Sequence, residues 1–296
     1  MDETERAFAE LCRTEPVRTE IAAIESKRAS AIGKFWLIML TGIALDGLVL
    51  WLVIALGWPI AGGVIVILLF LGTIIVATRP LAWMIQGVKI SVLRTLAQAR
   101  GMDFMPGGFD PPVFPAARAS LFGKLTAESF TDLFHGPGGV PAVYEAMLAR
   151  QNGKNASVCF SGQIYAFRQA LAATEEVVVR SDGGLFALSS PPGLERVRFE
   201  SDADFDRRFD VQATRVDQGH ALLGDALRRL LLELRGTGRV YGYVGPAGVV
   251  IAVAGRNLFE PGNMFRSIGA TDRVRRMFEE VGASLAILER LQACIL

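Results

Sequence analysis

The sequence contains few of the residues that catalytic and metal sites use most. Its 296 residues include two histidines, His135 and His220, and three cysteines. None of these stands at a metal-ligand spacing such as HxxxH or CxxC, and GxSxG, GxGxxG and the P-loop pattern are absent. An odd cysteine count without paired spacing is typical of reduced thiols. We therefore expect no metal, no cofactor and no assigned catalytic residue.

Catalysis by a cysteine–histidine pair remains one open interpretation. Cys159 could act as a nucleophile with His135 or His220 as its base. Cys159 stands between Val158 and Phe160 in a predicted strand, and there a small core residue is the more usual role. We therefore expect Cys159 to be structural.

A charge of one sign is also missing. Lys and Arg number 31, Asp and Glu number 30, and the net charge is +1. This balance gives no reason to expect a nucleic-acid partner. The apolar residues, in contrast, are concentrated in one place, because residues 35–77 contain Asp46 as their one charged residue.

This apolar run is about twice as long as the ~20 residues that one membrane helix needs. It is interrupted at Gly57-Trp58-Pro59, and proline begins a helix well but cannot continue one. We expect a transmembrane helical hairpin over residues 35–78, with spans at 35–56 and 60–77. A buried helical hairpin of a soluble core is the alternative, which the near absence of polar residues disfavours.

Cations flank the apolar run on both outer sides, and its turn carries no charge. Cations stay on the cytoplasmic side of a membrane, so we expect both termini in the cytoplasm. The cations before the run are Lys27, Arg28 and Lys34, and those after it are Arg79, Lys89, Arg94 and Arg100.

Composition divides the rest of the chain into segments. The helix after the second span is expected to continue as a stalk beside the N-terminal helix, or else to lie flat on the inner leaflet. The expected segments are an N-terminal cytoplasmic helix (1–34), the hairpin (35–78), an amphipathic juxtamembrane helix (79–100), a Pro- and Gly-rich linker (101–118), a cytoplasmic α+β domain (119–270) and an amphipathic C-terminal helix (271–296).

Helix and strand patterns mix after residue 118 without regular alternation. This predicts an α+β domain with a mostly antiparallel sheet. A helix is expected over 218–235, capped by Asp217 and ended by Gly236. The predicted strands cover residues 157–167, 176–180, 185–188, 196–199, 211–214, 240–244 and 249–253, and the last two form a β-hairpin around Gly-Pro-Ala-Gly.

The stretch DADFDRRFDV, residues 202–211, resembles the start of a calcium loop. Such a loop needs Gly at its sixth position and Glu at its twelfth, where this sequence has Arg207 and Ala213. We expect a structural role instead. Ser201 or Asp202 caps a short helix, and Phe205 and Phe209 stack four residues apart before a strand that begins at Val211.

Further residues in this half resemble a bacterial family of unknown function. The similar pattern has an F-x-x-x-F-x-V step, an Asp-Gln pair before a helix, a β-hairpin and a final D/N-L-F-E. The resemblance implies an inner-membrane protein with two N-terminal transmembrane helices and a cytoplasmic α+β domain, and it implies no activity. The matching residues are Phe205, Phe209, Val211, Asp217, Gln218, Asn257, Leu258, Phe259 and Glu260.

Asp46 is the residue for which we most expect a function. An ionised carboxylate in the middle of a membrane span costs about 2.5–3.5 kcal/mol on insertion scales. Asp46 should lie near Thr73 on the returning helix, and Gly42, Gly47 and Gly72 would permit close approach. Three interpretations stay open: a protonated Asp46 bonded to Thr73 within the hairpin, a contact with another subunit, or a relay for protons or ions.

Together these patterns predict a membrane-anchored cytoplasmic binding or scaffold module with no identified chemistry. Its expected partners are the lipid bilayer, another membrane or cytoplasmic protein, and a further copy of the chain. One alternative is a subunit of a transport or envelope complex, with Asp46 as the intramembrane contact. A second alternative is an enzyme at the membrane surface, with acids or histidines gathered in a deep pocket.

Overall fold

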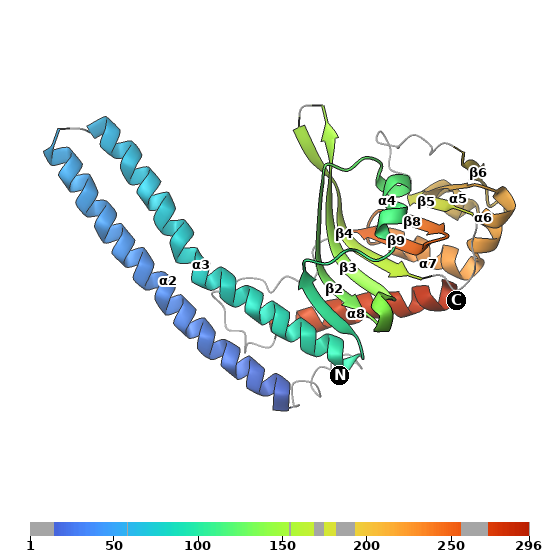
Figure 1. The fold of residues 1–296 in the computed structure, drawn as a ribbon, viewed down its shortest axis with the longest axis horizontal. Helices are drawn as coiled ribbons and strands as arrows, with labels where there is room; N and C mark the ends of the chain where they lie inside the picture. Colours follow the sequence, from blue (N-terminus) through green and yellow to red (C-terminus); the bar gives the residue numbers. More distant parts are fainter. Residues whose placement is uncertain are drawn as a thin grey trace. The chain divides into compact units, whose positions relative to one another are not determined.

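The computed structural model describes residues 15–57, 59–153, 155–168, 175–181, 193–255 and 272–295 (Figure 1). The chain divides into two compact units. One comprises Met1–Thr95 and Glu260–Glu279, and the other comprises Leu96–Phe259 and Glu280–Leu296.

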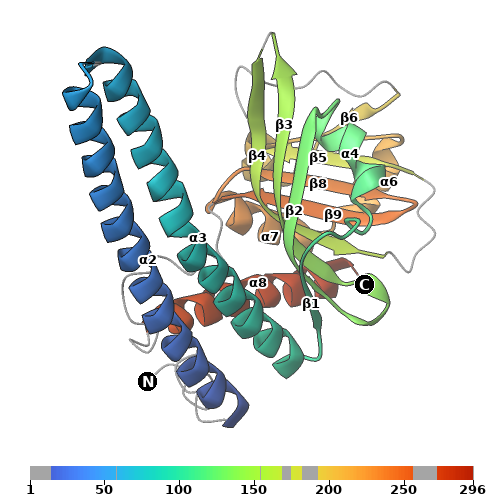
Figure 2. The same ribbon diagram turned by 60° about the vertical axis from the view of Figure 1, so that its left-hand side comes forward.

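The first unit is built on two long helices, α2 (Glu15–Ala55) and α3 (Pro59–Ala99). They lie side by side and antiparallel (Figures 1 and 2). Gly57 makes the tight turn between them with a φ of +73°, which glycine adopts without strain. Each helix has 41 residues, so each is about 60 Å long. The apolar runs and their polar flanks therefore belong to the same two helices.

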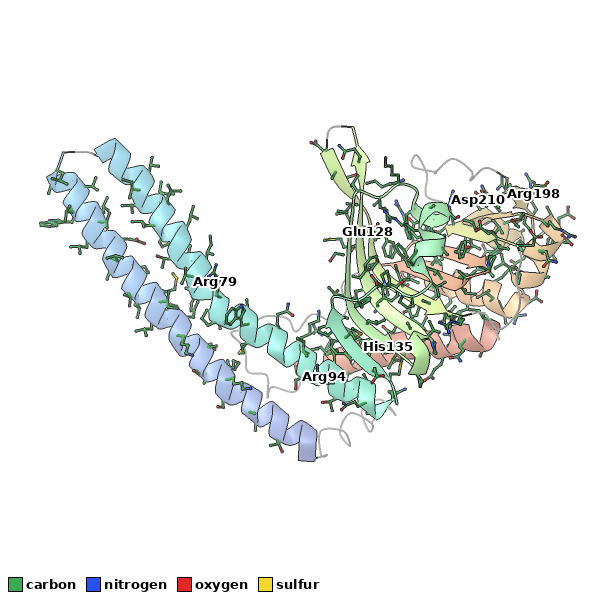
Figure 3. The ribbon with its side chains drawn as sticks, viewed as in Figure 1. Arg79, Arg94, Glu128, His135, Arg198 and Asp210 are labelled. Atoms are coloured by element: carbon green, nitrogen blue, oxygen red, sulfur yellow. The ribbon has the colours of Figure 1, made fainter. Side chains whose placement is uncertain are left out.

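Helix α3 contains Pro80. Proline lacks the backbone N–H, and its ring collides with the carbonyl four residues earlier, so it bends a helix. Figure 3 shows α3 changing direction close to Arg79. The bend falls just after the apolar run ends.

The second unit is α+β, as predicted. Nine strands in the described residues form one sheet in the order β1-β2-β3-β4-β9-β8-β5-β7-β6, and every neighbouring pair is antiparallel. The strands are β1 (Asp103–Gly107), β2 (Ala127–His135), β3 (Ala142–Asn152), β4 (Asn155–Phe167), β5 (Val177–Ser181), β6 (Glu195–Val197), β7 (Phe209–Ala213), β8 (Val240–Gly245) and β9 (Gly248–Ala254).

Helices cover both faces of this sheet. Helix α4 (Phe114–Phe122) packs its Phe114 and Leu121 against a core cluster that includes Tyr144 of β3 and Ile164 of β4. Side chains alternate along a strand, so Gln163 points to the opposite face. There it bonds to α8, as described below. The other helices of this unit are α5 (Ala203–Arg208), α6 (Val216–Leu222), α7 (Asp225–Arg235) and the part of α8 (Asp272–Ile295) that begins at Glu280.

Residues 101–118 differ from the expected linker, because they contain β1 and the start of α4. Two of the prolines that suggested a linker lie within regular secondary structure. Pro106 lies in β1, an edge strand, where a missing N–H costs little. Pro115 lies in the first turn of α4, where proline is favoured.

The expected helix over 218–235 is two helices, with α6 ending at Leu222 and α7 beginning at Asp225. Gly224 takes an extended conformation at the N-cap of α7. The leucine pattern continues across this break, so it gave no sign of the interruption. The strand expected at 185–188 lies outside the described residues.

Candidate functional site

The two long helices pack tightly against each other where Gly42 of α2 faces Thr73 of α3. A β-carbon placed on Gly42 would stand 2.2 Å from Thr73 Cγ2 and 2.7 Å from Thr73 Oγ1. No side chain fits in that space, so Gly42 allows α2 to lie directly against Thr73 of α3. Small residues at helix–helix contacts act in this way inside membranes.

Asp46 lies one turn from Gly42 on the same face of α2. Its side chain is buried, with 6% of the residue exposed, and among the described residues its Oδ2 atom has no hydrogen-bond partner. The structure shows no hydrogen bond between Asp46 and Thr73 in this described helix pair, since Thr73 faces Gly42. Asp46 is therefore a buried polar group at the helix contact with hydrogen-bonding capacity to spare.

The outward surfaces of the two helices are strongly apolar. Two stretches, Glu25–Ala55 and Gly63–Ala99, are long and apolar enough to cross a membrane, with a mean hydropathy of 2.4 over their best 18 residues. Only 6% and 11% of those windows are buried within the protein. Trp51 and Leu68 are each more than 60% exposed. Within the described part of the chain, no other segment covers most of this apolar surface.

The acidic stretch at 202–211 has the predicted structural role. Asp202 caps α5, because its Oδ1 accepts a hydrogen bond of 3.2 Å from the backbone N–H of Phe205. The rings of Phe205 and Phe209 stack with centroids 4.8 Å apart. Asp206 accepts a bond of 2.8 Å from the N–H of Phe199. The described residues contain no cluster of three or more His, Cys, Asp or Glu that could hold a metal.

Arg228 of α7 is a central residue of this region that the sequence patterns did not indicate. It donates from Nε to Asp202 (3.2 Å), from Nη1 to the carbonyl of Leu223 (2.7 Å) and from Nη2 to Asp225 (2.6 Å). Its guanidinium also lies 4.6 Å from the ring centroid of Phe199. An arginine on the leucine-lined face of the helix was the available signal. Arg228 joins α5, the α6–α7 break and α7.

Of the remaining residues of the family-like pattern, three lie in β7 and α6, and four lie outside the described residues. Val211 is buried in β7, which begins two residues earlier than expected, at Phe209. Asp217 is not the expected N-cap but lies in the first turn of α6. Hydrogen bonding from Arg215 lowers the pKa of this exposed carboxyl. Gln218 is half-buried beside it. Asn257, Leu258, Phe259 and Glu260 lie outside the described residues.

Cys159 lies far from His135 along the sheet, and the His220 ring contacts Phe199. The register of β2, β3 and β4 places His135 across from Ala166, by way of Ala142, and Cys159 lies seven residues away along β4, a distance of about 23 Å. The His220 ring packs on Phe199, with centroids 4.8 Å apart. Burial raises the pKa of the Cys159 thiol, which makes it a poorer nucleophile.

Comparison with known proteins adds a family match and one structural likeness. Residues 158–293 match DUF3137, a protein family of unknown function. The match runs from β4 into α8 and contains the F-x-x-x-F-x-V step at 205–211 and the Asp217-Gln218 pair. It leaves out the two long helices. A comparison with curated proteins finds no match.

Among solved structures, the crystal structure of the mycobacterial trehalose monomycolate transport factor A, TtfA, is similar. The two chains are 10% identical, with a TM-score of 0.33, and the likeness covers 68% of this chain and 96% of that one.

Proposed function

We propose that this chain is a membrane-anchored binding or scaffold module, with α2 and α3 crossing the bacterial inner membrane and the α+β unit in the cytoplasm. The exposed apolar surface of the helix pair carries the proposal. Each large apolar side chain left in water forgoes about 1.5–3 kcal/mol, and patches of this extent mark sites that meet a membrane or a partner. A bilayer covers such a surface along two adjacent helices.

Helix length and charge support the orientation. Each helix is about 60 Å long and a hydrocarbon core is about 30 Å thick. Roughly half of each helix therefore extends beyond the core, and the polar halves at 15–34 and 78–99 both lie on the side away from the turn. The cations there, Lys27, Lys34 and Arg79 among them, support a cytoplasmic location for that side. The two polar halves form the stalk.

Thiol labelling in whole cells tests the topology. In a background with Cys12, Cys159 and Cys294 changed to serine, Leu56→Cys at the turn should react with an impermeant maleimide in intact cells. Ala29→Cys and Lys124→Cys should react only after permeabilisation. Equal labelling of all three, or release of the protein by alkaline carbonate, would contradict the anchor.

Crosslinking in cells tests the binding role. The tagged full-length chain is extracted in mild detergent after crosslinking, and the mass of the complex is measured. A stoichiometric second protein supports a scaffold, and its identity names the process. A homo-oligomer alone supports a self-assembling module. A monomer under every condition would argue against a scaffold.

A second candidate function, a subunit of a transport or envelope complex, is favoured by the spare hydrogen-bonding capacity of Asp46. A buried carboxyl with an unpartnered oxygen can serve as a contact for a third helix that displaces or joins the pair. Asp46→Asn keeps the shape and removes the titratable group. It should disrupt the crosslinked complex while membrane insertion stays normal. An intact complex in this variant would exclude Asp46 as the contact.

A further inference from the structure

A cavity of about 1000 Å³ lies between α2 and α3, just beyond the apolar runs. It is open because α3 bends at Pro80 and because several residues facing it are small. Gly87 is one of them, since a β-carbon there would meet no atom within 4 Å. The cavity is at the upper end of the size range of small-molecule sites.

The cavity lining is cationic. Lys27, Lys34 and Arg79 all line it, and the described residues that line it include no Asp or Glu. Arg28 belongs to the neighbouring face of α2 and is already paired, with its Nη2 2.5 Å from Glu25 Oε1. Three positive side chains around one hollow, with hydroxyl groups such as Ser30 beside them, suit a ligand that carries phosphate oxygens.

The lining also changes in polarity along the helix axis. Ile38 and Val76 line the end nearest the apolar runs, Lys34 and Arg79 come next, and Lys27 lies about 10 Å further out. The polar zone of one leaflet is about 5–7 Å thick, so Lys34 and Arg79 fall at the level of the lipid phosphates. An apolar end followed by cations matches the order of groups in a phospholipid.

The position of Trp83 also indicates that the cavity lies at the level of the lipid headgroups. It lines the cavity one turn after Arg79 and is 80% exposed. Tryptophan gathers at the level of the lipid headgroups, where its ring is half in apolar and half in polar surroundings. Its position marks the cavity as interfacial.

We propose that this cavity binds the headgroup of an anionic phospholipid, with Lys34 and Arg79 contacting the phosphate and Lys27 contacting the outer part of the headgroup. The proposal rests on the membrane anchoring proposed above. Basic pockets between helices on the cytoplasmic side recognise lipid phosphates in this way. A free phosphate ion shares the charge but leaves the apolar end of the cavity unexplained.

Quenching of Trp83 by brominated lipids tests the proposal on the full-length chain. Trp36, Trp51 and Trp58 are changed to Phe, and the protein is reconstituted with brominated phosphatidylglycerol or brominated phosphatidylcholine. The anionic lipid should reach half-maximal quenching at about one twenty-fifth of the mole fraction, since each of the two cations at the phosphate, Lys34 and Arg79, contributes about a fivefold preference. Lys34→Gln/Arg79→Gln should lose most of this preference.

The matched control is Arg28→Gln/Arg94→Gln. It removes one cation from each helix, as the test variant does, but neither residue lines the cavity. Figure 3 shows Arg79 and Arg94 well apart along α3. The control should keep the preference. Equal losses in both double variants, or no preference in the parent protein, would overturn the cavity as a lipid site.

Two further measurements distinguish failure of the lipid site from failure of the membrane anchor. Excess inorganic phosphate should leave the quenching unchanged, and displacement of the lipid by phosphate would overturn the proposal in favour of a free anion. Flotation with vesicles reports on the anchor itself. A parent protein that floats but shows no lipid preference contradicts only the lipid site, whereas one that does not float contradicts the anchored function as well.

Discussion

Gly42 and Thr73 fix the separation of the two long helices, because the Thr73 side chain occupies the space that a β-carbon on Gly42 would need. Glycine interrupts an isolated helix at a cost of about 1 kcal/mol. Here that cost is offset by close packing along the helix pair, which buries Asp46 and Ala77. The contact is therefore specific to this pair of positions.

Gly42→Leu should separate the helices and weaken the hairpin. The new side chain would collide with Thr73, and moving either backbone away would open the close packing that buries Asp46 and Ala77. We expect the midpoint of thermal unfolding in detergent to fall by several degrees. Gly47→Leu is the matched control, because a β-carbon on Gly47 meets no atom within 4 Å. Equal effects of the two changes would refute the close contact.

Asp46→Leu should stabilise the purified hairpin in the absence of a partner. The change removes a buried carboxyl with an unpartnered oxygen, and such an atom costs about 1–3 kcal/mol. The expected result is a higher unfolding midpoint in detergent than that of the parent protein. A lower midpoint would show that the carboxyl makes a stabilising contact within the hairpin.

The sequence predicted the elements whose patterns are local. The two long helices follow from one apolar run, and the hairpin of β8 and β9 follows from two β-branched runs around a Gly-Pro-Ala-Gly turn. Strand β3, AVYEAMLARQN, was missed because Ala, Glu, Met, Leu and Arg favour helix. It is a strand because β2 and β4 pair with it on both sides, and tertiary pairing outweighs weak propensity.

The site residues show the same division. Asp202 and the Phe205–Phe209 stack were predictable because their contacts lie within a few residues. The role of Arg228 was not predictable. Its partners are Asp202, which is 26 residues away in the sequence, and the carbonyl of Leu223 at a helix break that no residue pattern marked. The cavity between α2 and α3 depends on the separation of two helices after the bend at Pro80, which a one-dimensional pattern does not contain.

Arg228→Ala should destabilise the α+β unit by about 3 kcal/mol. The arginine is buried, and its removal leaves Asp202 and the carbonyl of Leu223 without their partner. Breaking a buried charge pair by removing one member costs about 3–5 kcal/mol, and partial exposure of Asp202 reduces this figure. Arg229→Ala on the same helix is exposed and should change stability by less than about 0.5 kcal/mol. Chemical denaturation followed by near-ultraviolet circular dichroism compares the two. Similar losses would refute the role of the Arg228 network.

Two buried tyrosines of the sheet, Tyr165 and Tyr144, differ in the hydrogen bonding of their hydroxyl groups. Gln163 donates from Nε2 to Ser284 Oγ (2.9 Å), and its Oε1 accepts a bond of 2.7 Å from the Tyr165 hydroxyl. The Tyr144 hydroxyl is also buried, but it has no partner among the described residues. Tyr165→Phe should therefore cost about 1 kcal/mol at neutral pH, and Tyr144→Phe should be neutral or slightly stabilising.

Alkaline pH should destabilise the α+β unit through the same two residues. Burial raises the pKa of Tyr144 and of Tyr165 above the ordinary value of 10.0. Above that pH an unfolded chain releases the phenolic protons while the folded chain keeps them, so the unfolded state binds fewer protons and stability falls as pH rises. The loss is about 1.4 kcal/mol per tyrosine for each pH unit above 10, and below that value there is none. Tyr144→Phe should remove one tyrosine's share of the loss, which is measured as a smaller decrease in the free energy of unfolding between pH 9 and about pH 11. An unchanged alkaline slope would mean that the Tyr144 hydroxyl reaches solvent in the folded protein.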